Sequence, residues 1–411
     1  MTSVPQLERR LGLVDAVWIG LGSMIGAGVF AVWAPAAQVA GSALLVGLLL
    51  AAGVAWCNAR SSAVLAARYP RAGGTYLYGR EVLGPWAGFL AGWSFVIGKT
   101  ASSAAMALTA AAYLAPGHER LVAAAAVVVL TAVNCAGVTR TAALTRVIVA
   151  VVVTGLVLLV VVGAVEVGQD GARPWTAAPD GWYGVLQSAG LLFFAFAGYA
   201  RIATLGEEVR DPERVIPQAI RGAFAGAVTL YAAIGVVALL VLGAPGLADS
   251  SSPLADVARA AGADALVPVV RILAALAALG ALLALGAGIG RTALAMARER
   301  DLPPVLAAVH PRFGTPARAE LTVGAVVLAL VLLTDLRGAI GFSSFGVLLY
   351  YLVANLAAHR VEGAFRARLR ATLGAAGCVL LVVTLPAAAV GVGVVVLLVG
   401  IVGRAVAVKL R

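Results

Sequence analysis

The groups with the clearest capacity for chemistry in this sequence are backbone amides and carbonyls, and a run of glycines marks where we expect them to be exposed. Four glycines fall within nine residues of one apolar stretch, at positions 20, 22, 26 and 28. Each glycine in a helix interior costs about 1 kcal/mol relative to alanine. The run therefore predicts a break in a helix, and the free N–H groups that follow a break favour an anion such as a carboxylate.

A packing interpretation of the same glycines stays open beside this one. Gly22 and Gly26 have the spacing that lets two helices approach closely, and we expect part of the run to serve that purpose. A dinucleotide-binding loop is excluded, because no strand precedes the run and no alternating strand–helix pattern surrounds it.

A second apolar stretch, near residues 183–205, has aromatic residues and a glycine at its centre. Phe194 and Phe196 precede Gly198 and Tyr199 there. Such an aromatic stripe packs helices together as readily as it lines a binding site, so both interpretations stay open. Matching interruptions in two halves of a chain are typical of transporters built from inverted repeats, with the substrate site between the repeats.

Two basic side chains, Lys99 and Arg201, fall well inside apolar stretches. A charge near the centre of a bilayer costs at least about 2.5–3.5 kcal/mol on insertion scales, so each is a functional candidate. Buried lysine exchanges a proton near neutral pH more readily than arginine does. Our hypothesis is that Lys99 carries protons; the alternative is a bond to a backbone carbonyl or to Ser102 or Ser103.

Arg201 has two interpretations of its own. In the first, it forms a structural ion pair with Glu207 or Glu208. In the second, it faces the pocket and selects a substrate with a second carboxylate.

The composition explains why such groups would be buried in lipid. Hydrophobic residues make up 62% of the 411 residues and charged residues 12%, with a mean hydropathy of +1.00. A soluble domain carries about 25% charged residues. These values predict an integral membrane protein and exclude disordered chains, secreted disulfide scaffolds and soluble domains.

We expect an all-α fold with about twelve transmembrane helices, because a bilayer needs roughly 20 apolar residues per crossing and no strand alternation is present. The expected spans lie near residues 13–38, 42–67, 84–114, 121–138, 143–167, 183–205, 217–243, 266–297, 319–334, 338–358, 371–385 and 387–406.

The arginines predict the orientation. If spans alternate, most of the 30 lysines and arginines lie on one side, and the positive-inside rule places both termini in the cytoplasm. The net charge of +11 then reflects topology, with no nucleic-acid partner. We expect a multi-pass protein of the inner (cytoplasmic) membrane without a cleavable signal peptide.

Enzyme and channel classes find little support in the sequence. The three histidines lie at span ends or in loops, and no two carboxylates share the middle of a span, so no catalytic constellation is apparent. The three cysteines lack metal-type spacing. We expect no enzyme activity, no metal, no cofactor and no disulfide.

At the glycine run and at the aromatic residues around Gly198, the chain resembles the amino acid–polyamine–organocation (APC) superfamily of permeases. The glycine run is similar to the first-helix signature of that family, and three further motifs follow in the family's order. The similar segments are residues 20–30, 69–76, 196–199 together with 207–217, and 290–303.

The resemblance implies a LeuT-like 5+5 inverted repeat with discontinuous helices 1 and 6. The repeats would span residues 1–167 and 168–360, with helices 11 and 12 in residues 361–411. By position, amides near Ala27 and Gly28 would bind a substrate carboxylate, and carbonyls near Met24, Phe194 and Ala197 its ammonium. The full set of implied substrate-binding residues is Ser23, Met24, Gly26, Ala27, Gly28, Phe194, Phe196, Ala197 and Arg201.

Departures from the family pattern refine the expected substrate and coupling ion. Many members have an acid where this chain has Ala200, which argues against arginine, lysine or polyamines as substrates. The helix-five lysine that replaces sodium in some members is missing, since Val151 and Val152 stand there. Residues 281–290 carry no hydroxyl group for a sodium site. We therefore expect protons rather than sodium.

The sequence thus predicts a secondary active transporter that moves a small amino acid across the membrane by alternating access. An exchanger without proton coupling and a substrate sensor are the alternatives. Glu207, Glu208 and Arg210 form a charge cluster that is either a cytoplasmic gate or a solvated surface. A monomer and a homodimer are both compatible with the sequence.

Overall fold

The computed structural model describes residues 11–69, 73–137, 142–199, 202 and 209–409. It is 84% helical, and the described residues form no strand beyond one isolated bridge between Leu11 and Val209. The predicted all-α fold is therefore confirmed. The helices are α1 (Leu13–Met24), α2 (Gly28–Ala31), α3 (Trp33–Ala40), α4 (Leu44–Arg68), α5 (Gly74–Leu83), α6 (Pro85–Leu114), α7 (Glu119–Cys135), α8 (Ala142–Asp170), α9 (Gly181–Phe196), α11 (Pro212–Ala248), α12 (Pro253–Ala260), α13 (Leu266–Arg298), α14 (Ala317–Leu333), α15 (Leu336–Val361), α16 (Phe365–Thr384) and α17 (Ala387–Lys409).

Local sequence signals set several helix boundaries. Pro85 stands in the first turn of α6, where its missing N–H needs no partner. The carboxylate of Asp335 accepts a hydrogen bond from the amide of Gly338, 2.8 Å away, and caps the start of α15. Pro386 separates α16 from α17, as its position between two apolar stretches predicts.

Nine helical segments in the described part of the chain are long and apolar enough to cross a membrane. Large apolar side chains are exposed along the outer helices, for example Val395 on α17 at 60% and Val161 on α8 at 52%. Such faces need an apolar surrounding, so the protein is a multi-pass membrane protein. Each predicted span overlaps a helix, while the number of spans and their grouping into two repeats stay predictions.

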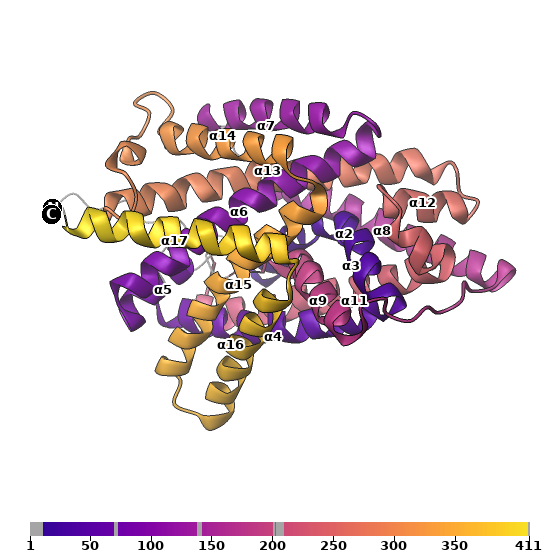
Figure 1. Ribbon diagram of the computed structural model, residues 1–411, viewed down its shortest axis with the longest axis horizontal. Coiled ribbons are helices and arrows are strands. Elements are labelled where there is room, and N and C mark those ends of the chain that lie inside the picture. Colours follow the sequence, from indigo (N-terminus) through magenta and orange to yellow (C-terminus); the bar gives the residue numbers. More distant parts are fainter. Residues whose placement is uncertain (1–10, 70–72, 138–141, 200–201, 203–208, 410–411) are drawn as a thin grey trace.

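Helix α6 forms the centre of the molecule. It crosses the middle of the ribbon diagram, with α7, α13 and α14 on one side and α4, α15 and α16 on the other (Figure 1). Most of its residues are buried, and its most extensive contacts are with α15 and α13. Lys99, halfway along α6, is therefore held at the centre of the protein.

Candidate functional site

The predicted break in the first apolar stretch is present. Helix α1 ends at Met24, and Ile25 leaves the helical conformation with φ −80° and ψ 62°. The amide of Gly26 turns back to the carbonyl of Met24 at 2.9 Å. Helical structure resumes only at Gly28.

The break leaves three backbone amides without an acceptor among the described residues. The amides of Ala27, Gly28 and Val29 donate no hydrogen bond to any group in the described part of the chain. All three residues are buried. A buried amide without a partner costs about 1–3 kcal/mol, so this segment can gain free energy from an added acceptor.

The second predicted break is also present. Helix α9 ends at Phe196, and Ala197, Gly198 and Tyr199 form a turn. Arg201, Glu207 and Glu208 lie outside the described residues. Helix α9 thus ends just before Gly198, where the sequence predicts it to be interrupted. The discontinuity of the whole 183–205 span and the roles predicted for Arg201 and the two glutamates stay predictions.

The two breaks contact each other through their glycines. A Cβ atom added at Gly198 would overlap the carbonyl of Ser23 and lie 2.7 Å from the amide nitrogen of Met24. A Cβ at Gly28 would lie 2.6 Å from the Cα atom of Ala195. Because the obstructing atoms are backbone, they cannot move aside as a side chain can. The glycines therefore allow main chain to pack on main chain where the helices are interrupted.

Lys99 joins α6 to the second break. Its ammonium donates a hydrogen bond to the carbonyl of Ala197 at 3.1 Å, and the hydroxyl of Tyr351 donates to the same oxygen at 3.3 Å. Lys99 is 9% exposed. The backbone-carbonyl partner that the sequence left open is thus the one observed for the ammonium. Ser102 bonds to Gly98 and Ser343, and the Ser103 hydroxyl donates to the backbone carbonyl of Lys99 rather than meeting its ammonium.

Tyr231 on α11 joins the two breaks from another direction. Its hydroxyl lies 2.7 Å from the carbonyl oxygen of Met24 and 3.1 Å from that of Ala195. Sequence reasoning missed both Tyr231 and Tyr351. The available signal was a tyrosine in the middle of an apolar span, because a buried hydroxyl requires a partner.

The aromatic residues Phe194 and Phe196 of α9 are both buried. Phe196 is fully buried against Tyr231 and Phe224, with ring centroids 5.2 and 5.8 Å away. Phe194 is 7% exposed. The packing interpretation thus describes Phe196 in this conformation.

Helix α13 closes one side of the first break with small residues. A Cβ atom at Gly26 would lie 3.1 Å from the Cβ of Ala281. Ala27 packs with Ala278 of α13 and Ala110 of α6 in a small apolar cluster. These neighbours offer no polar side chain to the break.

A separate buried cluster of charges forms around Asp301, just after α13. Its carboxylate accepts hydrogen bonds from Arg80 at 2.9 Å and from the hydroxyl of Tyr76 at 2.8 Å, and pairs with Arg404 at 3.1 Å. Burial and Asp301 both raise the pKa of Tyr76. We call these four residues the Asp301 cluster; the sequence analysis did not anticipate it.

Arg404 is held on three sides. It donates to the carbonyl of Pro85 at 2.7 Å, and its guanidinium carbon lies 4.5 Å from the ring centroid of Trp86 and 4.8 Å from that of Phe89. The Asp301 cluster thereby attaches α17 to α5, α6 and the end of α13.

Two other sites carry less chemistry. Arg210 is exposed, and its amide donates to the carbonyl of Leu11 at 3.0 Å, which attaches the start of the described chain to the segment before α11.

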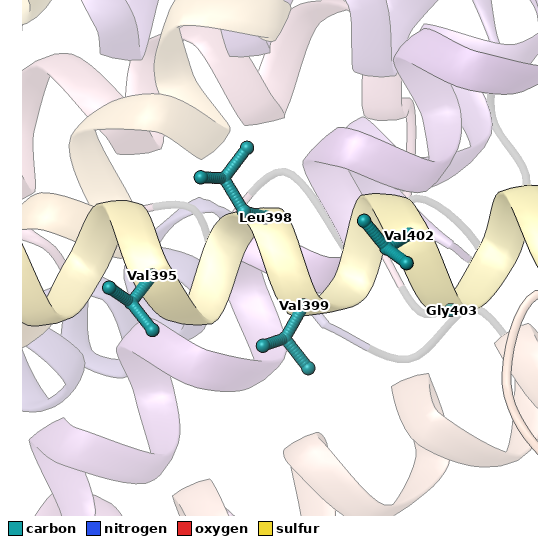
Figure 2. Close-up of a pocket in the computed structure, with 5 residues that line it drawn as sticks. All are labelled: Val395, Leu398, Val399, Val402 and Gly403. Carbon is teal, nitrogen blue, oxygen red and sulfur yellow. The ribbon is translucent and has the colours of Figure 1, made fainter.

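Figure 2 shows a hollow along the outer face of α17. Only apolar residues line it: Val395, Leu398, Val399, Val402 and Gly403. An exposed apolar hollow of this kind suits lipid chains rather than a polar substrate.

Cys57, Cys135 and Cys378 are free thiols in this structure. Within the described residues, no group of histidine, cysteine, aspartate and glutamate side chains is arranged to hold a metal ion.

Comparison with known proteins gives a family. The model of the amino acid permease family matches residues 11–410. Uncharacterized transporters of Mycobacterium tuberculosis and Mycobacterium bovis are 58% identical over 96% of this chain and 90% of their own length.

More distant relatives have named substrates. A methylthioribose transporter of Bacillus subtilis is 28% identical over 85% of this chain and 80% of its own. Cationic amino acid transporter 7 of Arabidopsis thaliana is 28% identical over 85% of this chain and 65% of its own.

Proposed function

We propose, because the chain belongs to the amino acid permease family, that it is a secondary active transporter that moves a small amino acid across the cytoplasmic membrane by alternating access. One observation carries this proposal: the ends of α1 and α9 meet backbone to backbone, next to buried amides that have no acceptor among the described residues. Irregular backbone at membrane depth is expected only where it is shielded by protein or serves a ligand.

The proposed substrate site lies at the two breaks. We assign the substrate carboxylate to the amides of Ala27 and Gly28, which have no acceptor among the described residues. The other residues of the proposed site are Ser23, Met24, Gly26, Phe194, Phe196, Ala197 and Arg201.

Lys99 is the proposed proton carrier. Its buried ammonium reaches from α6 to the end of α9, and a neutral amine would donate more weakly to the carbonyl of Ala197. Gain or loss of one proton would therefore change how firmly α6 holds the second break. No sodium site is proposed, since the part of α13 beside Gly26 presents alanine.

The remaining proposals concern topology and gating. Both termini lie in the cytoplasm of a cell whose inner membrane holds the protein, and two five-helix repeats span residues 1–167 and 168–360, followed by helices 11 and 12 in residues 361–411. Glu207, Glu208 and Arg210 form the cytoplasmic gate. The positive-inside distribution of arginines supports this orientation.

The test begins with the purified protein. A thermal-shift screen against the twenty amino acids and common amines identifies ligands, because a ligand that binds only the folded state raises its stability. Each ligand is then tested for uptake into proteoliposomes with and without a pH gradient. Saturable, gradient-driven uptake supports a proton-coupled permease. Uptake only against internal substrate indicates an exchanger, and binding without flux indicates a sensor.

A further inference from the structure

The carbonyl oxygens at the two breaks already have donors. An amino acid held between two interrupted helices needs acceptors for its ammonium group, and the carbonyls at the ends of α1 and α9 are the natural ones. Here the hydroxyl of Tyr231 lies 2.7 Å from the Met24 oxygen. The Ala197 oxygen receives both Lys99 and Tyr351.

The position of Lys99 is set by a close helix contact. A Cβ at Gly98 would lie 2.9 Å from the amide nitrogen of Val347, and a Cβ at Gly346 would lie 2.6 Å from the Cα of Gly98. Helices α6 and α15 therefore touch through their backbones at this level. Lys99 follows Gly98 directly and Tyr351 lies one turn beyond Val347, so the contact delivers both donors to one carbonyl.

The charge of Lys99 has no counter-charge among the described residues. Every ion pair in the described part of the chain involves an arginine, and no described carboxylate pairs with Lys99. An ammonium with 9% exposure is largely desolvated, so its field acts at higher strength than it would in water. A second cation nearby is disfavoured and an anionic group is favoured.

We infer that Lys99 is a specificity-determining residue that supplies the ammonium group of the site itself. This inference rests on the proposed function and names the substrate class: small carboxylates with neutral or negative net charge. The transporter rejects arginine, lysine and polyamines, because each would bring a second cation to Lys99. The substrate's own amino group is dispensable, because the Met24 and Ala197 carbonyls that it would use already accept hydrogen bonds from the protein.

The experiment measures competition in proteoliposomes. The strongest neutral substrate from the thermal-shift screen is the counterflow substrate. Arginine, glutamate and the 2-hydroxy analogue of that substrate are each tested as competitors of its counterflow. In the wild-type protein we expect arginine to compete at least tenfold more weakly than the neutral substrate. We expect the 2-hydroxy analogue to compete within about threefold of it.

Variants then locate the selectivity. In Lys99→Gln, the ratio of competition by the neutral substrate to competition by arginine should fall at least tenfold. In Lys99→Arg, which keeps the positive charge, that ratio should stay as in the wild-type protein. Thr109→Ala is the matched control, because the partner described for this buried hydroxyl is the carbonyl of Ala105 on the same helix. If Lys99→Gln does not fold, the wild-type competition with arginine and the 2-hydroxy analogue still decides the inference.

The outcomes separate the two proposals. Arginine competing as well as the neutral substrate, failure of the 2-hydroxy analogue, or unchanged selectivity in a folded Lys99→Gln variant would overturn the role of Lys99 alone. Absence of binding and uptake for every amino acid tested would overturn the proposed function, and this inference with it.

Discussion

The two breaks and the Asp301 cluster both join distant helices in the interior, but through different forces. At the breaks, backbone packs on backbone, and neutral or singly charged donors reach carbonyl oxygens. In the Asp301 cluster, two guanidinium groups and a hydroxyl converge on one buried carboxylate. A neutral hydrogen bond is worth about 1 kcal/mol net, whereas loss of one partner of a buried ion pair costs about 3–5 kcal/mol.

This difference suggests which contacts separate during transport. Contacts at the breaks can exchange protein partners for substrate or water at small cost, provided that no side chain blocks the close approach. The Asp301 cluster resists separation, because opening it would leave charges buried without partners. We therefore expect the breaks to move and the Asp301 cluster to stay closed.

The largest expected effect comes from the close approach itself. Gly198→Ala places a methyl group on the carbonyl of Ser23, where only backbone could yield. We expect loss of most folded protein, measured as the monodisperse fraction in size-exclusion chromatography, and no uptake. Gly53→Ala is the control, since nothing lies within 4 Å of its added Cβ; a normal yield for Gly198→Ala would show that the breaks do not touch.

Removing the shared acid of the Asp301 cluster should have the next largest effect. Asp301→Asn removes the 3% exposed carboxylate that pairs with both Arg80 and Arg404, whose side chains are 26% and 6% exposed. We expect about 3 kcal/mol of destabilisation, seen as a lower unfolding midpoint in detergent. Glu299→Gln is the control, because this partner of Arg80 is 55% exposed and should contribute less than about 1 kcal/mol. Equal shifts for both variants would contradict a buried charge cluster.

Lys99 offers a functional test of the same comparison. Lys99→Ala removes the only charge that reaches the second break from α6 in the described structure. We expect the uptake that remains to have lost its pH dependence, measured as initial rate against external pH under a fixed gradient. Arg80→Lys, in the Asp301 cluster, should leave that dependence in place. A pH profile unchanged by Lys99→Ala would remove the proton role.

The smallest effect is expected from one neutral donor. Tyr351→Phe removes a hydroxyl from the carbonyl of Ala197 but leaves Lys99 on the same oxygen. We expect about 1 kcal/mol of destabilisation and folded, active protein. The assay is the unfolding midpoint together with the uptake rate. A loss as large as that of Asp301→Asn would mean that the breaks depend on a cooperative network rather than on replaceable contacts.

Much of the site could be predicted from local sequence. The glycines at 26 and 28 predict the interruption after Met24, and Gly198 with its aromatic neighbours predicts the one after Phe196. Both follow from backbone physics that acts within a few residues. The partner of Lys99 could not be predicted, because Ala197 is 98 positions away and any carbonyl would have suited the ammonium equally.

The sequence by itself determined that the chain lives in a membrane, that it is helical, and where its helices come apart, because hydropathy and glycine content act locally. Only the tertiary structure decided that the two interruptions touch, that Tyr231 and Lys99 occupy their carbonyls, and that Asp301 collects Arg80 and Arg404. Those choices depend on which helices pack together, and packing is settled by shape and by the pairing of buried polar groups across the whole chain.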